Sequence, residues 1–147
     1  MRIFARPHQI PPRAVAGAFI LNSGLNKADP DEEAAAVIHG MAVGTYPFLA
    51  EQHPQRFTKL VSAAEVALGA ALLMPVVPSL VAGAALTAFA GSLLGLYLKT
   101  PGMREEGSLK PTQEGIGLAK DVWLLGIGLG LVLEELCDRK SSPSSGA

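Results

Sequence analysis

The sequence is poor in the residues that build disulfides, metal sites and nucleic-acid interfaces. Its single cysteine, Cys137, allows neither a disulfide within the chain nor a four-ligand zinc site, and we interpret this thiol as a small hydrophobe at the end of an apolar run. Aromatic residues make up only 5% of the 147 residues, the net charge is -1, and no basic patch is interleaved with aromatics. Nucleic-acid binding needs such a patch, so we expect no nucleic-acid partner.

Motifs for cofactors and for catalysis are also missing. The sequence contains no Cys-x-x-Cys, no Gly-rich phosphate loop and no nucleophile elbow. The three histidines, His8, His39 and His53, fall in or near predicted loops, where isolated histidines are usually solvated. We therefore expect no cofactor bound by the chain itself, and the sequence identifies no catalytic residue.

Long apolar runs are the most informative feature that is present. Hydrophobic residues make up 49% of the chain, and charges crowd into a few segments that leave nearly uncharged runs between them. From Leu60 to Leu98 the only charge is Glu65. As one helix this run would measure roughly 58 Å, whereas the hydrocarbon core of a bilayer is about 30 Å thick. The run must fold back, and Pro75 and Pro78 predict a tight hairpin because proline interrupts helices.

The same reasoning predicts an all-α integral membrane protein, a four-helix transmembrane bundle. Residues 1–137 form the membrane domain and residues 138–147, rich in Ser, Gly and Pro, form a disordered tail. No small-x-small cleavage site precedes Lys27, so we expect the first span to be retained. The spans are predicted at about 13–27, 57–74, 78–98 and 112–137.

A shorter helix is predicted between the first two spans. Asp29 has the character of an N-cap, Pro30 suits the first helical position, and Glu32 completes a capping pattern. Pro47 ends the apolar pattern before it is long enough to cross a bilayer. We therefore place this helix at the membrane surface or as a re-entrant segment.

Small residues recur every four positions and predict close helix packing. The alternative interpretation is that Ala and Gly are simply frequent in this chain. On the packing hypothesis, the contact positions are Gly83, Thr87, Gly91 and Gly95 in one helix, Ala63, Ala67 and Ala71 in another, and Gly126 with Gly130 in the last.

The charges flanking the spans predict the orientation of the chain in the membrane. Arg2, Arg6 and Arg13 precede the first span while only Lys27 closely follows it, so both termini are expected on the cytoplasmic side. The far loops carry basic residues as well, so the total count does not decide the orientation. These residues are Arg56, Lys59, Lys99, Arg104 and Lys110.

Ionisable residues at membrane depth form the candidate site, because such groups are costly unless paired or hydrated. Glu65 and Asp121 each lie about 12 to 13 Å into spans that run in the same direction. Lys27 closes the first span on that side, so Glu65 is predicted to pair with Lys27 or Lys120. The full predicted cluster is Asn22, Ser23, Lys27, Glu65, Lys120 and Asp121.

Three interpretations of this cluster remain open. It is a salt-bridge network that holds the bundle together, or a site for a small polar molecule or a quinone head group. In the third interpretation Lys27 and Lys120 simply extend to the membrane interface.

The segments that carry these residues resemble the DoxX-like family of small four-helix bacterial membrane proteins. The likeness covers roughly residues 13–134, and two features depart from the family pattern: the long charged segment after the first span, and the Lys120–Asp121 pair. The resemblance rests on the run from Gly17 to Lys27, on Glu65 followed by Ala67-Leu68-Gly69, and on Asp121-Val122-Trp123-Leu124-Leu125-Gly126.

The resemblance implies a role in a membrane redox system. The family includes small subunits associated with thiosulfate:quinone oxidoreduction and, in actinobacteria, a membrane partner of superoxide dismutase and a sulfurtransferase. Our leading hypothesis is a noncatalytic subunit that anchors or completes a redox or respiratory assembly in the bacterial inner membrane, with other membrane subunits as partners. The alternative is a quinone-linked oxidoreductase subunit whose polar cluster binds the quinone.

Overall fold

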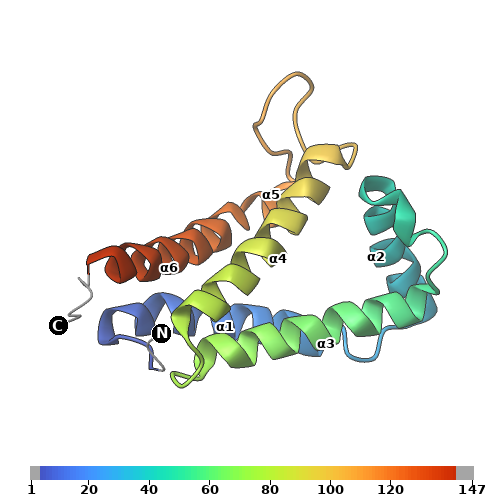
Figure 1. Ribbon diagram of the computed structural model, residues 1–147. Coiled ribbons are helices and arrows are strands. Elements are labelled where there is room, and N and C mark those ends of the chain that lie inside the picture. The colour runs from blue at the N-terminus through green and yellow to red at the C-terminus, as the bar shows by residue number, and fades with distance from the viewer. Residues whose placement is uncertain (1–3, 142–147) are drawn as a thin grey trace.

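The chain is all-helical, as the sequence predicts. The computed structural model describes residues 4–141, and within them the only extended pairing is an isolated bridge between Arg104 and Pro111. The helices are α1 (Ile10–Asn26), α2 (Glu32–Thr45), α3 (Pro54–Leu73), α4 (Ser79–Lys99), α5 (Ile116–Ala119) and α6 (Val122–Ser141), with 3₁₀ turns at Pro7–Gln9 and Pro47–Leu49 (Figure 1).

Helices α1 and α3 form one antiparallel pair. Gly17 faces Gly69, whereas Gly24, two turns further along α1, faces Ser62 and Glu65. The helices approach so closely that a Cβ atom on Gly69 would lie 2.7 Å from the backbone nitrogen of Leu21. Only glycine allows this backbone approach, so these small residues determine how α1 and α3 pack.

Helices α4 and α6 form a second antiparallel pair, and here the predicted contact positions are largely wrong. Gly83 and Thr87 do contact α6, but their partner is Gly128. Among the described residues, no atom outside the local helix backbone and the adjacent residues lies within 4 Å of a Cβ built on Gly91, Gly126 or Gly130. A step of four residues advances about 400° around a helix, so Gly91 has turned about 80° away from Gly83. On α6, two residues correspond to about 200°, which places Gly126 and Gly130 opposite Gly128.

The two helix pairs meet at one end of the molecule and diverge at the other. Arg6 contacts Glu134, and Arg13 contacts both Leu72 and Ser79, so the starts of α1 and α4 and the ends of α3 and α6 lie together. We call this the terminal end. Figure 1 shows α3 and α4 diverging from their hairpin, with α2 at the opposite, wide end. Helix α2 contacts both α3 and α4 there, so it bridges the two pairs.

Helix α2 and the last helix differ from the predicted boundaries. Asp31, rather than Asp29, caps α2, and its Oδ1 accepts a hydrogen bond from the Ala34 amide at 2.7 Å. The predicted span 112–137 is broken, because α5 ends at Ala119 and α6 begins at Val122. Helix α6 continues to Ser141, so residues 138–141 of the predicted disordered tail are helical, and residues 142–147 lie outside the described range.

Two segments of the described chain are long and apolar enough to cross a membrane. They are α4, with 21 residues, and the 26 residues from Ile116 to Ser141. Helix α1 has only 17 residues, which corresponds to roughly 25 Å. Helix α3 has 20 residues and carries Arg56, Lys59 and Glu65 among them.

Candidate ligand site

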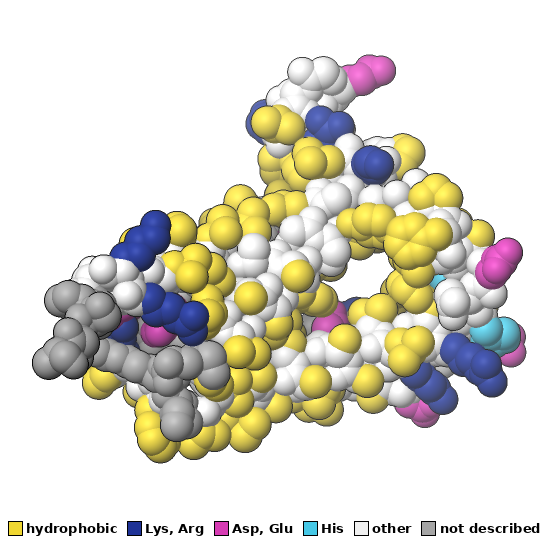
Figure 2. Space-filling view, viewed as in Figure 1, with side chains coloured by type: hydrophobic (Ala, Val, Ile, Leu, Met, Phe, Trp, Pro, Cys, Tyr) yellow, Lys and Arg dark blue, Asp and Glu magenta, His cyan; other side chains and the backbone are white. Residues whose placement is uncertain are grey.

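A cavity of about 600 Å³ lies at the wide end, where the helix pairs diverge. Helices α1, α2, α3 and α4 and the α5–α6 junction all contribute to its wall, and Figure 2 shows a hollow rimmed largely by hydrophobic side chains. Five aromatic side chains line it: Phe19, Tyr46, Phe48, Phe57 and Phe89. Pockets of about 300–1,000 Å³ with mainly apolar walls and a few polar groups are typical of sites for small molecules.

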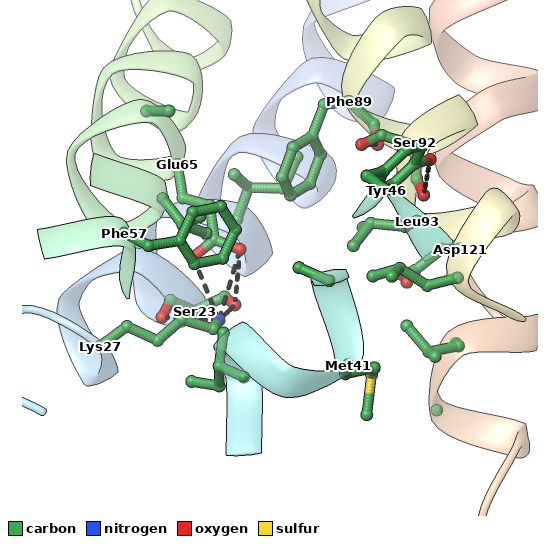
Figure 3. A pocket seen from close by; sticks show the side chains of 18 of the residues that line it. Ser23, Lys27, Met41, Tyr46, Phe57, Glu65, Phe89, Ser92, Leu93 and Asp121 are labelled. Atoms are coloured by element: carbon green, nitrogen blue, oxygen red, sulfur yellow. Dashed lines mark hydrogen bonds and ion pairs between the residues drawn. The ribbon is translucent and has the colours of Figure 1, made fainter. Parts of the chain in front are cut away.

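One polar group in this cavity is an ion pair between Lys27 and Glu65. The Lys27 Nζ lies 3.1 Å from Glu65 Oε2 and donates to the Ser23 Oγ at 2.5 Å (Figure 3). Glu65 is 4% exposed, and the side chain of Lys27 is 27% exposed. Lys27 directly follows α1, where a positive charge also interacts favourably with the helix dipole.

Asp121 lines the same cavity from the opposite wall. It lies in the turn between α5 and α6 and is 7% exposed. Figure 3 shows Asp121 across the cavity from Lys27, Ser23 and Glu65. The break between α5 and α6 therefore lies at the cavity wall, and Asp121 reaches the cavity from a turn rather than from a continuous helix.

Two members of the predicted cluster do not line the cavity. Asn22 and Lys120 are both exposed, although each is the sequence neighbour of a residue that lines it. Successive helical residues point about 100° apart, so Asn22 faces away when Ser23 faces inward. In the ion pair, the cation next to Glu65 is therefore Lys27 rather than Lys120.

His39 of α2 and Tyr46, which directly follows α2, are polar groups that sequence reasoning did not place at the wide end. The Tyr46 hydroxyl donates to the Ser92 carbonyl at 2.8 Å, which joins α2 to α4. His39 was expected in or near a loop, but it lies within α2, is 8% exposed, and its Nε2 lies 2.9 Å from the Leu49 carbonyl oxygen. Its ring meets Phe57 edge-on at 5.4 Å. The capping pattern of Asp29, Pro30 and Glu32, which predicts a short helix before Pro47, was the available signal that His39 is helical.

Arg13, predicted from the sequence only as a charge flanking the first span, is a buried structural residue. It is 1% exposed, and its guanidinium donates five hydrogen bonds at the terminal end, one of them to the Ser79 hydroxyl. The other four reach carbonyl oxygens at or beyond the end of α3, which have no partners within that helix. These carbonyls belong to Ala71, Leu72, Met74 and Val77. The prolines of the hairpin were the available signal for such a buried donor, because proline has no N–H and leaves carbonyl oxygens of the preceding turn without their helical hydrogen bonds.

A second charged cluster joins the start of the chain to α6. Arg6 contacts Glu134 at 2.8 Å and also pairs with Asp138, while Gln9 donates to Glu134 and Glu135. Desolvation lowers the pKa of Arg6, but the hydrogen bond with Asp138 and the neighbouring carboxylates raise it above its ordinary value. Arg6 therefore joins the segment before α1 to the last turns of α6.

Residues 4–141 contain no group of three or more His, Cys, Asp or Glu side chains placed to hold a metal ion. Comparison of the chain with family models, with curated proteins and with solved structures finds no match. The site is therefore interpreted from its own geometry.

Proposed function

We propose that this chain is an integral membrane protein in which α1, α3, α4 and α6 all cross the bilayer. Only 28% of the apolar stretch of α4 and 22% of that of Ile116–Ser141 is buried, whereas the core helix of a soluble protein is mostly buried. Helices α1 and α3 also direct large apolar side chains outward, among them Val15 at 70% and Leu60 at 65% exposure. Lipid is the solvent that suits such a surface.

Within this membrane protein, the cavity at the wide end binds a small amphipathic molecule that has a polar head group. The observation that carries this proposal is the placement of the Lys27–Glu65 pair and Asp121 on facing walls of one otherwise apolar cavity. Polar groups at membrane depth are costly and tend to be retained for function. A quinone, the ligand implied by the resemblance to DoxX-like proteins, belongs to this chemical class.

The wider role is that of a noncatalytic subunit in a redox or respiratory assembly of the bacterial inner membrane, in which partner subunits carry out the electron transfer. The resemblance supports this role. The alternative is a quinone-linked oxidoreductase subunit in which the polar cluster itself is the reaction site. Gentle extraction from native membranes distinguishes them, because recovery with partner proteins favours the first role and recovery alone, with bound quinone and turnover, favours the second.

Two neighbouring alanines of α3 provide a matched test of the cavity. Ala64 lines the cavity, whereas Ala63, also exposed, does not. In purified protein in detergent micelles, Ala64→Trp should abolish equilibrium binding of decylubiquinone by filling the cavity, and Ala63→Trp should bind like the unaltered protein. Equal binding by both variants would place the ligand elsewhere.

The membrane orientation has its own test. The start of α1 and the end of α6 lie together at the terminal end, as an even number of crossings requires, and we propose that this end is cytoplasmic. In a Cys137→Ser background, Ser108→Cys in the α4–α5 loop should react with a membrane-impermeant maleimide added to intact cells. Ser141→Cys at the end of α6 should react only after permeabilisation. The reverse pattern would invert the orientation, and labelling of both from outside would overturn the four-span arrangement.

A further inference from the structure

The charged groups of the cavity do not balance. Among the described residues that line it, three carry formal charges: Lys27, Glu65 and Asp121. The Lys27 ammonium is already engaged, because it contacts both carboxylate oxygens of Glu65 as well as the hydroxyl and carbonyl oxygens of Ser23. This pair is electrically neutral, so Asp121, when ionised, is the uncompensated charge among the described residues that line the cavity.

Asp121 has no partner among residues 4–141. Its backbone N–H donates to the Leu118 carbonyl at 3.1 Å, but no described side chain or amide donates to its carboxylate. Lys120, the adjacent cation in the sequence, is exposed and does not line the cavity. Asp121 as a residue is more than nine-tenths buried, and its carboxyl group faces the cavity without a donor among the described residues. Such a group calls for a positively charged or donating partner.

We infer that the cavity selects amphipathic cations, with Asp121 as the counter-ion for the positively charged head group. This inference rests on the proposed function, because it presupposes that the cavity binds a ligand. Tyr46, Phe57 and Phe89 present aromatic side chains to the same space. Aromatic faces attract cations while also contacting apolar substituents. Asp121 and the aromatic walls therefore recognise the charge and the apolar body of the same molecule.

Direct binding of tetraphenylphosphonium tests the inference with a lipophilic cation of fixed charge. Radiolabelled probe is measured on the purified full chain in detergent, with triphenylphosphine oxide as an uncharged comparison compound. The protein should bind the cation at least about tenfold more tightly, a factor that corresponds to about 1.4 kcal/mol. Asp121→Asn should remove that preference. Asp121→Glu should preserve it, as should Glu33→Gln, which neutralises an exposed carboxylate in the first turn of α2.

The outcomes separate this inference from the proposed function. Tight binding of the cation that Asp121→Asn leaves unchanged would overturn the inference, as would equal affinity for the charged and uncharged compounds. Binding of decylubiquinone without binding of the cation would overturn the inference and leave the proposed function intact. Failure of all three compounds to bind would overturn both. If Asp121→Asn does not fold, the comparison of the two phosphorus compounds on the unaltered protein still decides the question.

Discussion

The ion pair between Lys27 and Glu65 can be tested by a double-mutant cycle. At the observed 3.1 Å between Nζ and Oε2, an effective dielectric constant of about 20 gives a gross Coulomb attraction of about 5 kcal/mol. The cost of removing both groups from water offsets much of this attraction. Glu65→Gln leaves the Lys27 ammonium without its counter-ion, and so should lower the free energy of unfolding by about 3 kcal/mol.

Removing both charges should be less harmful than removing one. Glu65→Gln combined with Lys27→Met should recover about 1–2 kcal/mol relative to the sum of the single variants, within the range measured for residues in contact. The assay is unfolding in mixed detergent micelles, followed by circular dichroism. Lys120→Met provides the matched control, since Lys120 is exposed and lies outside the cavity. Its effect should simply add to that of Glu65→Gln.

Two results would refute this reasoning. A coupling energy below about 0.5 kcal/mol between Lys27 and Glu65 would mean that the pair contributes no more than independent sites do. Coupling of Glu65 to Lys120 instead would mean that the α5–α6 turn lies differently in the membrane. Loss of decylubiquinone binding in a double variant that has recovered its stability would instead indicate that the pair contacts the ligand.

Further substitutions test the buried arginine, the glycine contacts between helices and the cap of α2. Arg13→Met should lower the free energy of unfolding by about 3 kcal/mol or more, because several carbonyl oxygens at the hairpin lose their hydrogen-bond donor. Arg139→Met, on the exposed end of α6, should change stability little. Equal melting temperatures of the two variants would refute the anchoring role of Arg13. Gly69→Ala should destabilise by about 1–3 kcal/mol through overpacking, since its Cβ would lie 2.7 Å from a backbone nitrogen of α1. Gly91→Ala, whose added methyl group would lie in open space, should be neutral or stabilise the protein by up to about 1 kcal/mol. Thermal melts that rank the two glycine variants in the opposite order would refute the observed interface. Asp31→Ala should lower the stability of α2 by about 1 kcal/mol, because the helix loses its N-cap. Hydrogen exchange should then show faster exchange only at the start of α2. Faster exchange throughout the bundle would contradict a purely local cap.

The helical fold and the α3–α4 hairpin were readable from the sequence because they depend on local chemistry. The apolar run is longer than one bilayer crossing, and Pro75 and Pro78 interrupt it where the structure has its turn. Pro47 likewise follows the end of α2. The sequence did not reveal the break at Lys120 and Asp121, because neither position is a proline or glycine and an apolar helical pattern continues on both sides.

Packing between helices was predicted less well, because spacing alone does not say which part of a helix face meets a neighbour. The spacing predicts the four-residue stripe of α4 as one interface, yet only its first part, Gly83 and Thr87, contacts α6. Its last member, Gly95, instead lies against Tyr46, whose hydroxyl would be 2.5 Å from an added Cβ. His39 was misplaced for a related reason, since its burial depends on the 3₁₀ turn and on Phe57.

The candidate site shows the same division between local sequence and tertiary structure. The sequence by itself determined that ionisable residues would occur near the ends of apolar helices. Burying such groups costs free energy, which indicates that they are paired or functional. It also determined the roughly 100° between Asn22 and Ser23, because that angle belongs to the helix. Only the tertiary structure decided which of the two faces inward. The rotation of a helix about its own axis depends on which small residues let a neighbouring backbone approach, and in α1 those are Gly17 and Gly24 against α3.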